Sequence, residues 1–219
     1  MKYFQVMPKI ATIDYVGNKI VLTNLMVRTE IIPSLLNNPL LFYSYDIQDG
    51  DTPEIIADKY YGDSYRYWIV LFANQIIDPQ WNWPMNQNLF SDYVLDKYKS
   101  ATANSLNISA NTVTSSQILA YTQSNIQNYI KTIITIDSST NESTTSTYYI
   151  DSTAYALVQE NTSTGTFSSG AQVTQTVSKY TETLYEYETR LNESNRNINL
   201  VNSSYVSQFE SQFQSLLAQ

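Results

Sequence analysis

The sequence has 219 residues and a net charge of −8, from 20 acidic and 12 basic side chains. This length fits one large domain or two small ones. The absence of Cys and His excludes disulfides, thiolate nucleophiles, Ser-His-Asp triads and His/Cys zinc sites. Because no stretch is rich in Lys and Arg, we expect neither nucleic acid nor an anionic membrane surface as a partner.

No segment indicates a membrane anchor or an export signal. No span approaches the roughly 18 apolar residues of a membrane helix, and no apolar run follows the first residues. The absence of Cys fits synthesis in the cytoplasm. We therefore expect a soluble chain without a visible export signal.

Tyr is unusually common, with 19 residues, and only 15% of residues are charged. Typical domains have about 25% charged residues. Amphipathic aromatic side chains among adaptable polar ones suit contact surfaces. A biased genome composition would explain the same counts equally well.

The first part of the chain favours strands. Residues 12–16 and 19–22 flank Gly17-Asn18, which is a two-residue hairpin signal. Residues 25–28 fit either the start of a helical turn or an arm laid on a partner. A further strand is expected at 40–47.

A short helix follows, with clear start and stop signals. Thr52 is a good N-cap, and Pro53 suits the first helical position because its missing N–H costs nothing there. Gly62 supplies the left-handed residue that ends the helix. Asp63 or Ser64 then caps a second helix that Asp78-Pro79 stops. The apolar stripe expected on this second helix comprises Tyr65, Trp68, Ile69, Phe72 and Ile76.

Beyond residue 84 the signals become weaker and then recover. A helix is expected around 89–98 from its apolar spacing. Ser/Thr/Asn-rich loops are expected at 104–117 and 138–147, with a strand at 130–136 between them. Three further strand candidates are 148–150, 154–159 and 172–178.

The C-terminal part predicts strands and a helix. Alternation predicts a strand at 183–190, and 192–195 is expected to turn the chain into 197–201. Ser203 or Ser204 would cap a terminal helix. The apolar stripe of that helix comprises Val206, Phe209, Phe213 and Leu216 or Leu217. It packs on its own domain or on a partner.

The stretch from Tyr45 to Asn74 resembles a LysM domain. The residues that carry the resemblance are Tyr45, Ile47, Gly50, Asp51, Thr52, Ile56, Ala57 and Asn74. The longer string to Pro84 is similar to the LysM-like baseplate wedge subunit of T-even-type contractile-tailed bacteriophages. Its specific features are Tyr60-Tyr61-Gly62, Tyr67-Trp68, Asp78-Pro79 and Trp83-Pro84. Plain LysM modules lack them, and the run YEYETRLNESNRNINLV near the C-terminus resembles the same family.

The resemblance implies a fold and a function. The fold would be α+β, with a LysM-like βααβ-type core, a β-rich second region and a C-terminal amphipathic helix. The expected divisions are a hairpin or arm at 1–40, the LysM-like domain at 41–99, an insertion at 100–178 and the terminal strands and helix at 179–219. The protein would be a structural adaptor in a tail baseplate of the virion, assembled in the host cytoplasm. It would clamp adjacent wedges around the central hub, in six copies per baseplate, and bind other wedge and hub-proximal tail proteins.

Two other functions fit parts of the same sequence. LysM domains grip N-acetylglucosamine through loops that correspond here to Gly50–Thr52 and Asn74–Asp78, although helix capping explains these residues without a ligand. A cell-wall glycosidase would need a carboxylate pair. The candidates Asp46, Asp49, Asp51, Glu54 and Asp58 suit solvated turns and helix faces better.

We therefore expect no enzyme, no catalytic residues, no metal and no cofactor. Trp-Pro at 83–84 and the helix after it replace the second strand of a plain LysM chain, and we expect them to cover part of the sugar groove. Trp81 and Trp83 lie in a loop, so they either anchor an interface or pack over a small core. The residues expected to form an interface or a vestigial glycan groove are Gly50, Asp51, Thr52, Tyr60, Tyr61, Asn74, Asp78, Trp81, Trp83 and Pro84.

Overall fold

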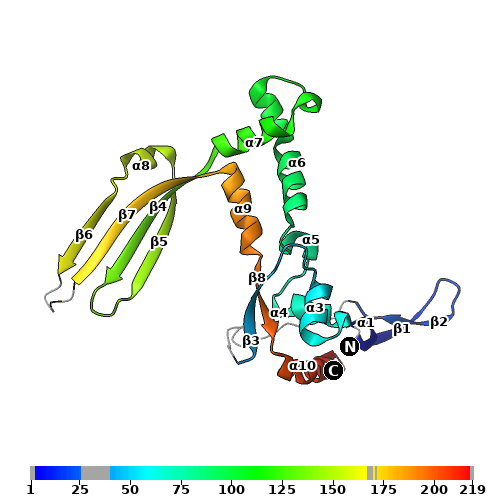
Figure 1. The fold of residues 1–219 in the computed structure, drawn as a ribbon. Helices are drawn as coiled ribbons and strands as arrows, with labels where there is room; N and C mark the ends of the chain where they lie inside the picture. Colours follow the sequence, from blue (N-terminus) through cyan, green and yellow to red (C-terminus); the bar gives the residue numbers. More distant parts are fainter. Residues whose placement is uncertain (1–2, 26–39, 167–169, 171, 218–219) are drawn as a thin grey trace. The chain divides into compact units, whose positions relative to one another are not determined.

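The computed structural model describes residues 3–25, 40–166, 170 and 172–217. The chain divides into two compact units, which are unit 1 (1–87 with 192–219) and unit 2 (88–191). Both helices and strands are abundant, so the expected α+β class is confirmed. Figure 1 labels the elements. Residues 26–28 of the expected turn or arm lie outside the described part of the chain.

Unit 1 brings together the two ends of the chain. Its elements are α1 (Tyr3–Val6), β1 (Lys9–Ile13), β2 (Lys19–Thr23), β3 (Phe42–Asp46), α3 (Pro53–Tyr61), the 3₁₀ turn η1 (Ser64–Arg66), α4 (Tyr67–Ala73), α5 (Pro79–Asn82), β8 (Asn197–Val201), η3 (Ser203–Tyr205) and α10 (Val206–Leu217).

The central sheet of unit 1 pairs strands that are distant in the sequence. β3 and β8 are antiparallel, with Phe42 opposite Val201 and Asp46 opposite Asn197. Helices α3 and α4 follow β3 in the chain, and unit 2 lies between α4 and β8 in sequence. Along the chain, the four elements of this part of unit 1 therefore follow the order strand, helix, helix, strand, and the two strands pair with each other. The strand expected at 197–201 is confirmed, but its pairing with β3 was not predicted.

Helix α3 forms as its local signals predict. The Thr52 hydroxyl accepts a hydrogen bond from the Ile55 N–H at 3.3 Å, and Pro53 is the first helical residue. Gly62 ends the helix with φ = 66°, in the left-handed region. Ile56 and Ala57 are fully buried on the inner face.

The second helix starts at the expected Asp63 cap but ends earlier than predicted. It begins as the η1 turn, which the Asp63 carboxylate caps, and α4 ends at Ala73 instead of continuing to Ile76. The helix stops because Asn74 caps it and Gln75 adopts a left-handed φ of 55°. Asp78 therefore does not stop α4, and it caps the one-turn helix α5 instead. The buried stripe is correspondingly short, and Tyr65 is 52% exposed.

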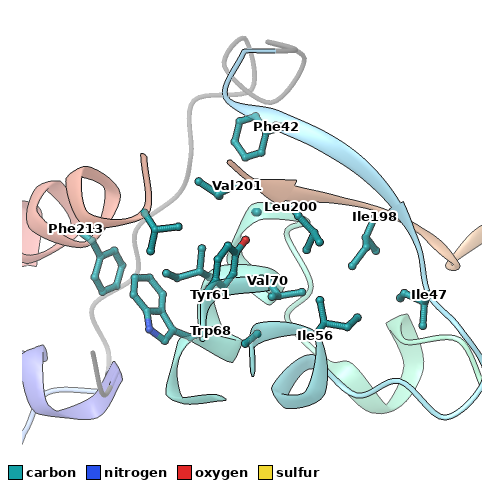
Figure 2. Packing of buried hydrophobic residues seen from close by; sticks show 14 of the residues in the cluster. Phe42, Ile47, Ile56, Tyr61, Trp68, Val70, Ile198, Leu200, Val201 and Phe213 are labelled. Atoms are coloured by element: carbon teal, nitrogen blue, oxygen red, sulfur yellow. The ribbon is translucent and has the colours of Figure 1, made fainter. Parts of the chain in front are cut away.

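The core of unit 1 lies between α3, α4, β8 and α10 (Figure 2). Trp68 is 3% exposed, and its ring centre lies 4.6 Å from that of Phe213. Val206 and Leu217 are buried in the same cluster. The terminal helix is therefore confirmed, and its apolar stripe packs on its own unit. Its lead-in turn is capped by Asn202 rather than by Ser203 or Ser204.

Unit 2 contains a long helix, shorter helices and a sheet. Its elements are α6 (Gln87–Leu106), η2 (Ala110–Thr112), α7 (Ser115–Ser124), β4 (Ile126–Asp137), β5 (Ser143–Ile150), α8 (Ser152–Leu157), β6 (Asn161–Thr166), β7 (Gln172–Thr183) and α9 (Leu184–Ser194). The first residue of α6 and the last three of α9 belong to unit 1.

The sheet of unit 2 has the strand order β5-β4-β7-β6 and is antiparallel throughout. Strands were expected at 130–136, 148–150 and 172–178, and the observed strands β4, β5 and β7 are longer. The loops expected at 104–117 and 138–147 are shorter than predicted. The first contains the end of α6 and the start of α7, and half of the second, from residue 143 on, belongs to β5.

Two expected strands are helices. Residues 183–190 were expected as a strand, but α9 begins at Leu184. Thr183 and Glu186 form reciprocal hydrogen bonds between side chain and backbone, which is a capping box. Residues 154–159 fall mostly in α8, where the Asp151 carboxylate accepts a hydrogen bond from the Ala154 N–H at 2.8 Å. In both cases a cap outweighs strand propensity.

Strands β1 and β2 form the expected hairpin with a longer turn. Ile13 pairs with Lys19, so the loop runs from Asp14 to Asn18 rather than through two residues only. Gly17 adopts φ = 93°, which requires no strain for a residue without Cβ.

Candidate functional site

The turn between β3 and α3 is held by the buried carboxylate of Asp51. Asp51 is 9% exposed. Its side chain accepts hydrogen bonds from the Tyr45 hydroxyl at 2.6 Å, the Lys59 ammonium at 2.7 Å and the Gln48 N–H at 3.2 Å. Every strong donor near this carboxylate is thus supplied by the turn itself and by the strand and helix that flank it.

The protonation states in this turn follow from those bonds. Burial raises the pKa of Asp51, but the bonds from Lys59 and Tyr45 outweigh it, so the pKa lies below its ordinary value. Burial and the bond to Asp51 raise the pKa of Tyr45 to about 12. Asp51 is therefore ionised and Tyr45 neutral near pH 7, and the carboxylate serves as a structural acceptor.

The segment that begins at Trp83 is bonded to the same turn. The Trp83 indole N–H donates to the Asp51 carbonyl at 2.9 Å, and the Gln87 N–H donates to the Asp49 carboxylate at 3.2 Å. Pro84 between them is buried. Trp83 also packs against the core of unit 1. Residues 83–87 therefore contact the loop that follows β3.

Asn74 joins helix α4 to strand β8. Its side-chain amide N–H group donates to the Val70 and Asn199 carbonyls, both at 2.8 Å. Its carbonyl oxygen accepts from the Asn199 N–H at 2.7 Å. The amide thus satisfies both backbone groups of Asn199 on the side of β8 that faces away from β3. The hydrogen-bonding capacity of Asn74 is largely used within unit 1.

A polar hollow of about 230 Å³ opens beside Asn74. Amide side chains dominate its lining, which comprises Asn74, Gln75, Ile76, Asn82, Ser194, Asn195, Asn197 and Ile198. Asn82 and Asn195 make no side-chain hydrogen bond within the described part of the chain. These two amides could therefore bind a neutral polar ligand or a segment of peptide backbone.

The other expected site residues occupy different environments. Trp81 is 68% exposed, and Ile77, four positions before it, is 83% exposed. Tyr61 is buried in the core, whereas Tyr60 at the surface contacts the ring of Tyr43 at a tilt and that of Tyr45 edge-on. Gly50 and Thr52 serve the turn and the helix cap, and Asp78 caps α5. The structure brings Asp51 and Trp83 together, and it leaves Trp81 facing solvent.

The carboxylates considered for hydrolysis have structural partners or lie on exposed surfaces. Asp46 accepts a hydrogen bond from the Asn197 amide at 2.6 Å, and Asp49 and Asp51 are bonded as described above. Glu54 and Asp58 are exposed on α3. Among the described residues, no group of three or more His, Cys, Asp or Glu side chains is arranged to hold a metal ion.

Unit 2 contains a buried acidic centre that the sequence did not reveal. Glu188 on α9 is 3% exposed, and it accepts hydrogen bonds from the Lys97 ammonium and the Tyr98 hydroxyl, both at 2.7 Å. Tyr93 donates to it at 3.1 Å. These donors lie on α6, so the cluster joins α6 to α9. Three donors compensate the desolvation of the carboxylate, which suits a structural role.

A family model described as base plate wedge protein 53 matches residues 12–216. No curated protein matches the chain. In the part of the chain that the structure describes, no helix combines the length and apolar character needed to cross a membrane.

Proposed function

The chain belongs to the base plate wedge protein 53 family, and from this membership we propose that it joins neighbouring wedges of a phage tail baseplate around the central hub. The family itself implies a structural role in the baseplate and contacts with other baseplate proteins. The finer proposal is a clamp, present in six copies per baseplate of a contractile tail. The single observation that carries it is the 68% exposure of the Trp81 side chain.

The strand, helix, helix, strand order of unit 1 supports a LysM-like core. In this proposal β3, α3, α4 and β8 are the four LysM elements, and unit 2 is inserted before the last strand. The divisions at 1–40, 41–99, 100–178 and 179–219 remain a prediction. The proposed core explains why the second strand is missing directly after Trp83-Pro84.

The contacts of Trp83 and Asn74 support a LysM-like core that no longer binds sugar. A LysM groove needs free polar groups on the loop after the first strand and on the loop after the second helix. Here the Trp83 indole N–H donates to the Asp51 carbonyl, and the Asn199 N–H donates to the Asn74 amide oxygen. In this proposal the groove is therefore closed to sugar, and the protein contacts other baseplate proteins through its outer surface.

Trp81 is the strongest candidate for such a contact. An aromatic side chain that is 68% exposed contributes little to the stability of unit 1, yet Trp is among the residues that dominate binding energy at interfaces. Ile77 adds a second exposed apolar side chain nearby in sequence. We propose that both are buried against another baseplate protein.

The experiment is complementation of a phage that lacks this protein. We expect Trp81→Ala to reduce assembled baseplates about tenfold or more, as for an interface hot spot, and Trp81→Phe to retain most of them. The purified Trp81→Ala protein should unfold like the wild type, since Trp81 is exposed. Normal baseplate numbers with Trp81→Ala and Ile77→Ala combined would refute the proposed contact.

Peptidoglycan binding is a second candidate, and the amide-lined hollow favours it. It predicts measurable affinity for chitin oligomers or muropeptides, lost on Thr52→Ala or Asn74→Ala, and also on Asn82→Ala combined with Asn195→Ala. Tight binding of muropeptides by a chain that ignores all tail proteins would replace the adaptor proposal. A tail-associated glycosidase is a weaker third candidate, which predicts cell-wall clearing that is lost when one carboxylate is replaced.

A further inference from the structure

The β1–β2 hairpin exposes apolar side chains on both of its faces. One face carries Ile10 and, opposite it, Leu22, which are 48% and 51% exposed. The other face carries Ile13 and Val21, which are 66% and 67% exposed. Within the described residues, no third strand joins this two-stranded sheet (Figure 1).

A hairpin of this kind is incomplete by itself. Two isolated strands are marginally stable in water, and a sheet that is solvated on one face normally alternates apolar and polar residues. The run Ile20-Val21-Leu22 has no such alternation. Strands with continuous apolar runs are those that other structure covers on both faces. The hairpin therefore fits a position between two surfaces.

The turn at the tip of the hairpin is rigidly built. The Asp14 carboxylate accepts hydrogen bonds from the Val16 N–H at 2.9 Å and from the Asn18 N–H at 2.8 Å. The Asn18 side-chain amide adds a third bond, and the Asp14 N–H donates to the Asn18 carbonyl at 2.9 Å. Gly17 supplies the positive φ that closes the loop.

This turn presents two side chains that are largely exposed. Tyr15 is 101% exposed and Val16 is 66% exposed. Tyr is enriched among binding hot spots, and holding it in a fixed turn removes much of the entropy cost of binding. An internally bonded turn with a fully exposed Tyr is therefore suited to act as an anchor.

The charge of the hairpin indicates what it contacts. Lys9 and Lys19 lie on the same face as Val21, near its two ends, and Asp14 is the hairpin's acidic residue, already bonded within the turn. The chain as a whole carries −8. A basic rim around an apolar face complements an apolar pocket with an acidic rim. The hollow described on this chain is lined mainly by amides, so a second copy does not offer that chemistry there.

We propose that the hairpin is a docking arm, with Tyr15 and Val16 at its tip and the Lys-flanked face of Ile13 and Val21 buried in an apolar, acid-rimmed groove of a different baseplate protein. This inference rests on the proposed baseplate function. It adds the segment that makes the contact and the chemistry of the surface that receives it.

A photo-cross-linking residue at position 15 tests the proposal in virions from a complemented infection. We expect irradiation to link this protein to a different baseplate protein through a site that contains Asp or Glu. Position 148 is the matched control, because Tyr148 is also on a hairpin and is 49% exposed. Tyr15→Ala should lower the amount of this protein per baseplate about tenfold or more, whereas Tyr148→Ala should leave it unchanged.

The outcomes separate this inference from the proposed function. A protein that is present in baseplates but forms no cross-link from position 15, or links there only to another copy of itself, overturns the docking arm and leaves the function intact. A protein that is absent from baseplates overturns both. Equal loss of incorporation with Tyr15→Ala and Tyr148→Ala also counts against the arm.

Discussion

Replacement of Asn74 by Ala distinguishes a structural role of this residue from a sugar-binding one. The change removes three hydrogen bonds that the amide makes to Val70 and Asn199. It leaves the N–H and carbonyl of Asn199 without their partner on the edge of β8. The backbone N–H of residue 74 still caps helix α4, so the loss is confined to the side-chain bonds.

The magnitude follows from the number of bonds. Each neutral hydrogen bond contributes a net stabilisation of about 1 kcal/mol, which gives an upper value of about 3 kcal/mol for the three. Asn199 is only half-buried, so water can replace part of what is lost. We therefore expect unit 1 to lose about 2–3 kcal/mol of its free energy of unfolding. With a urea m-value of about 1.5 kcal/mol/M, the midpoint falls by roughly 1.3–2 M.

Tryptophan fluorescence is a selective assay for this loss. All three Trp residues, at positions 68, 81 and 83, lie in unit 1, so their emission follows the unfolding of that unit alone. Asn195→Ala is the matched control, because Asn195 lines the same hollow without a side-chain hydrogen bond in the described structure. Its midpoint should stay within about 0.3 M of the wild type, as for surface substitutions. An unchanged midpoint for Asn74→Ala, with loss of binding to chitin oligomers, would refute the structural interpretation.

Three other predictions concern the two units separately. Replacing residues 88–191 by a short Gly-Ser linker should leave a folded unit 1 by circular dichroism, whereas a chain truncated at residue 87 should not fold, because it lacks β8. Glu188→Ala should destabilise unit 2 by about 3 kcal/mol in thermal unfolding, at the low end for a broken buried ion pair because Lys97 is 41% exposed and can be resolvated. Although burial lowers the pKa of Lys97, its hydrogen bond to Glu188 raises it above the ordinary value of 10.5. The contribution of the Lys97–Glu188 pair to the stability of unit 2 is therefore complete below pH 10.5 and is lost as the pH rises further. If the stability of Glu188→Ala fell equally steeply with alkaline pH, this assignment would be contradicted. Gly62→Ala should lower the free energy of unfolding in urea by about 1 kcal/mol. A Cβ at position 62 would meet no atom within 4 Å, so the only unfavourable effect is the backbone strain at φ = 66°.

The sequence predicts best where structure is decided locally. Helix α3 carries its own cap, its own first-turn Pro and its own terminating Gly, so its bounds follow from adjacent residues. For α9 the local signal was also present, as the capping box Thr183–Glu186. The alternation of Tyr185 and Tyr187 with their neighbours suggested a period of two instead. Caps therefore outweigh apparent alternation when the two conflict in a short segment.

Contacts between distant residues could not be predicted from the sequence alone. The pairing of Asp46 with Asn197 joins residues 151 positions apart. The burial of Glu188 depends on Lys97 and Tyr98, about ninety positions earlier. A charged residue is normally predicted to be exposed, because burying it is unfavourable unless partners compensate its charge. The role of Asn74 was likewise hidden, since Asn199 supplies two of its three bonds.

The ends of unit 2 explain how so long an insertion is compatible with the β3–β8 sheet. The Met85 N–H donates to the Asn192 amide oxygen at 2.7 Å, and the Asn192 amide N–H group donates back to the Met85 carbonyl at 3.2 Å. These reciprocal bonds hold together the points at which the chain leaves and re-enters unit 1. Loop-closure entropy rises by only about 0.6 kcal/mol for each doubling of loop length. Lengthening unit 2 should therefore cost unit 1 little, provided that Met85 and Asn192 still meet. The stability of the β3–β8 pair should depend on the bonds between Met85 and Asn192 far more than on the length of unit 2.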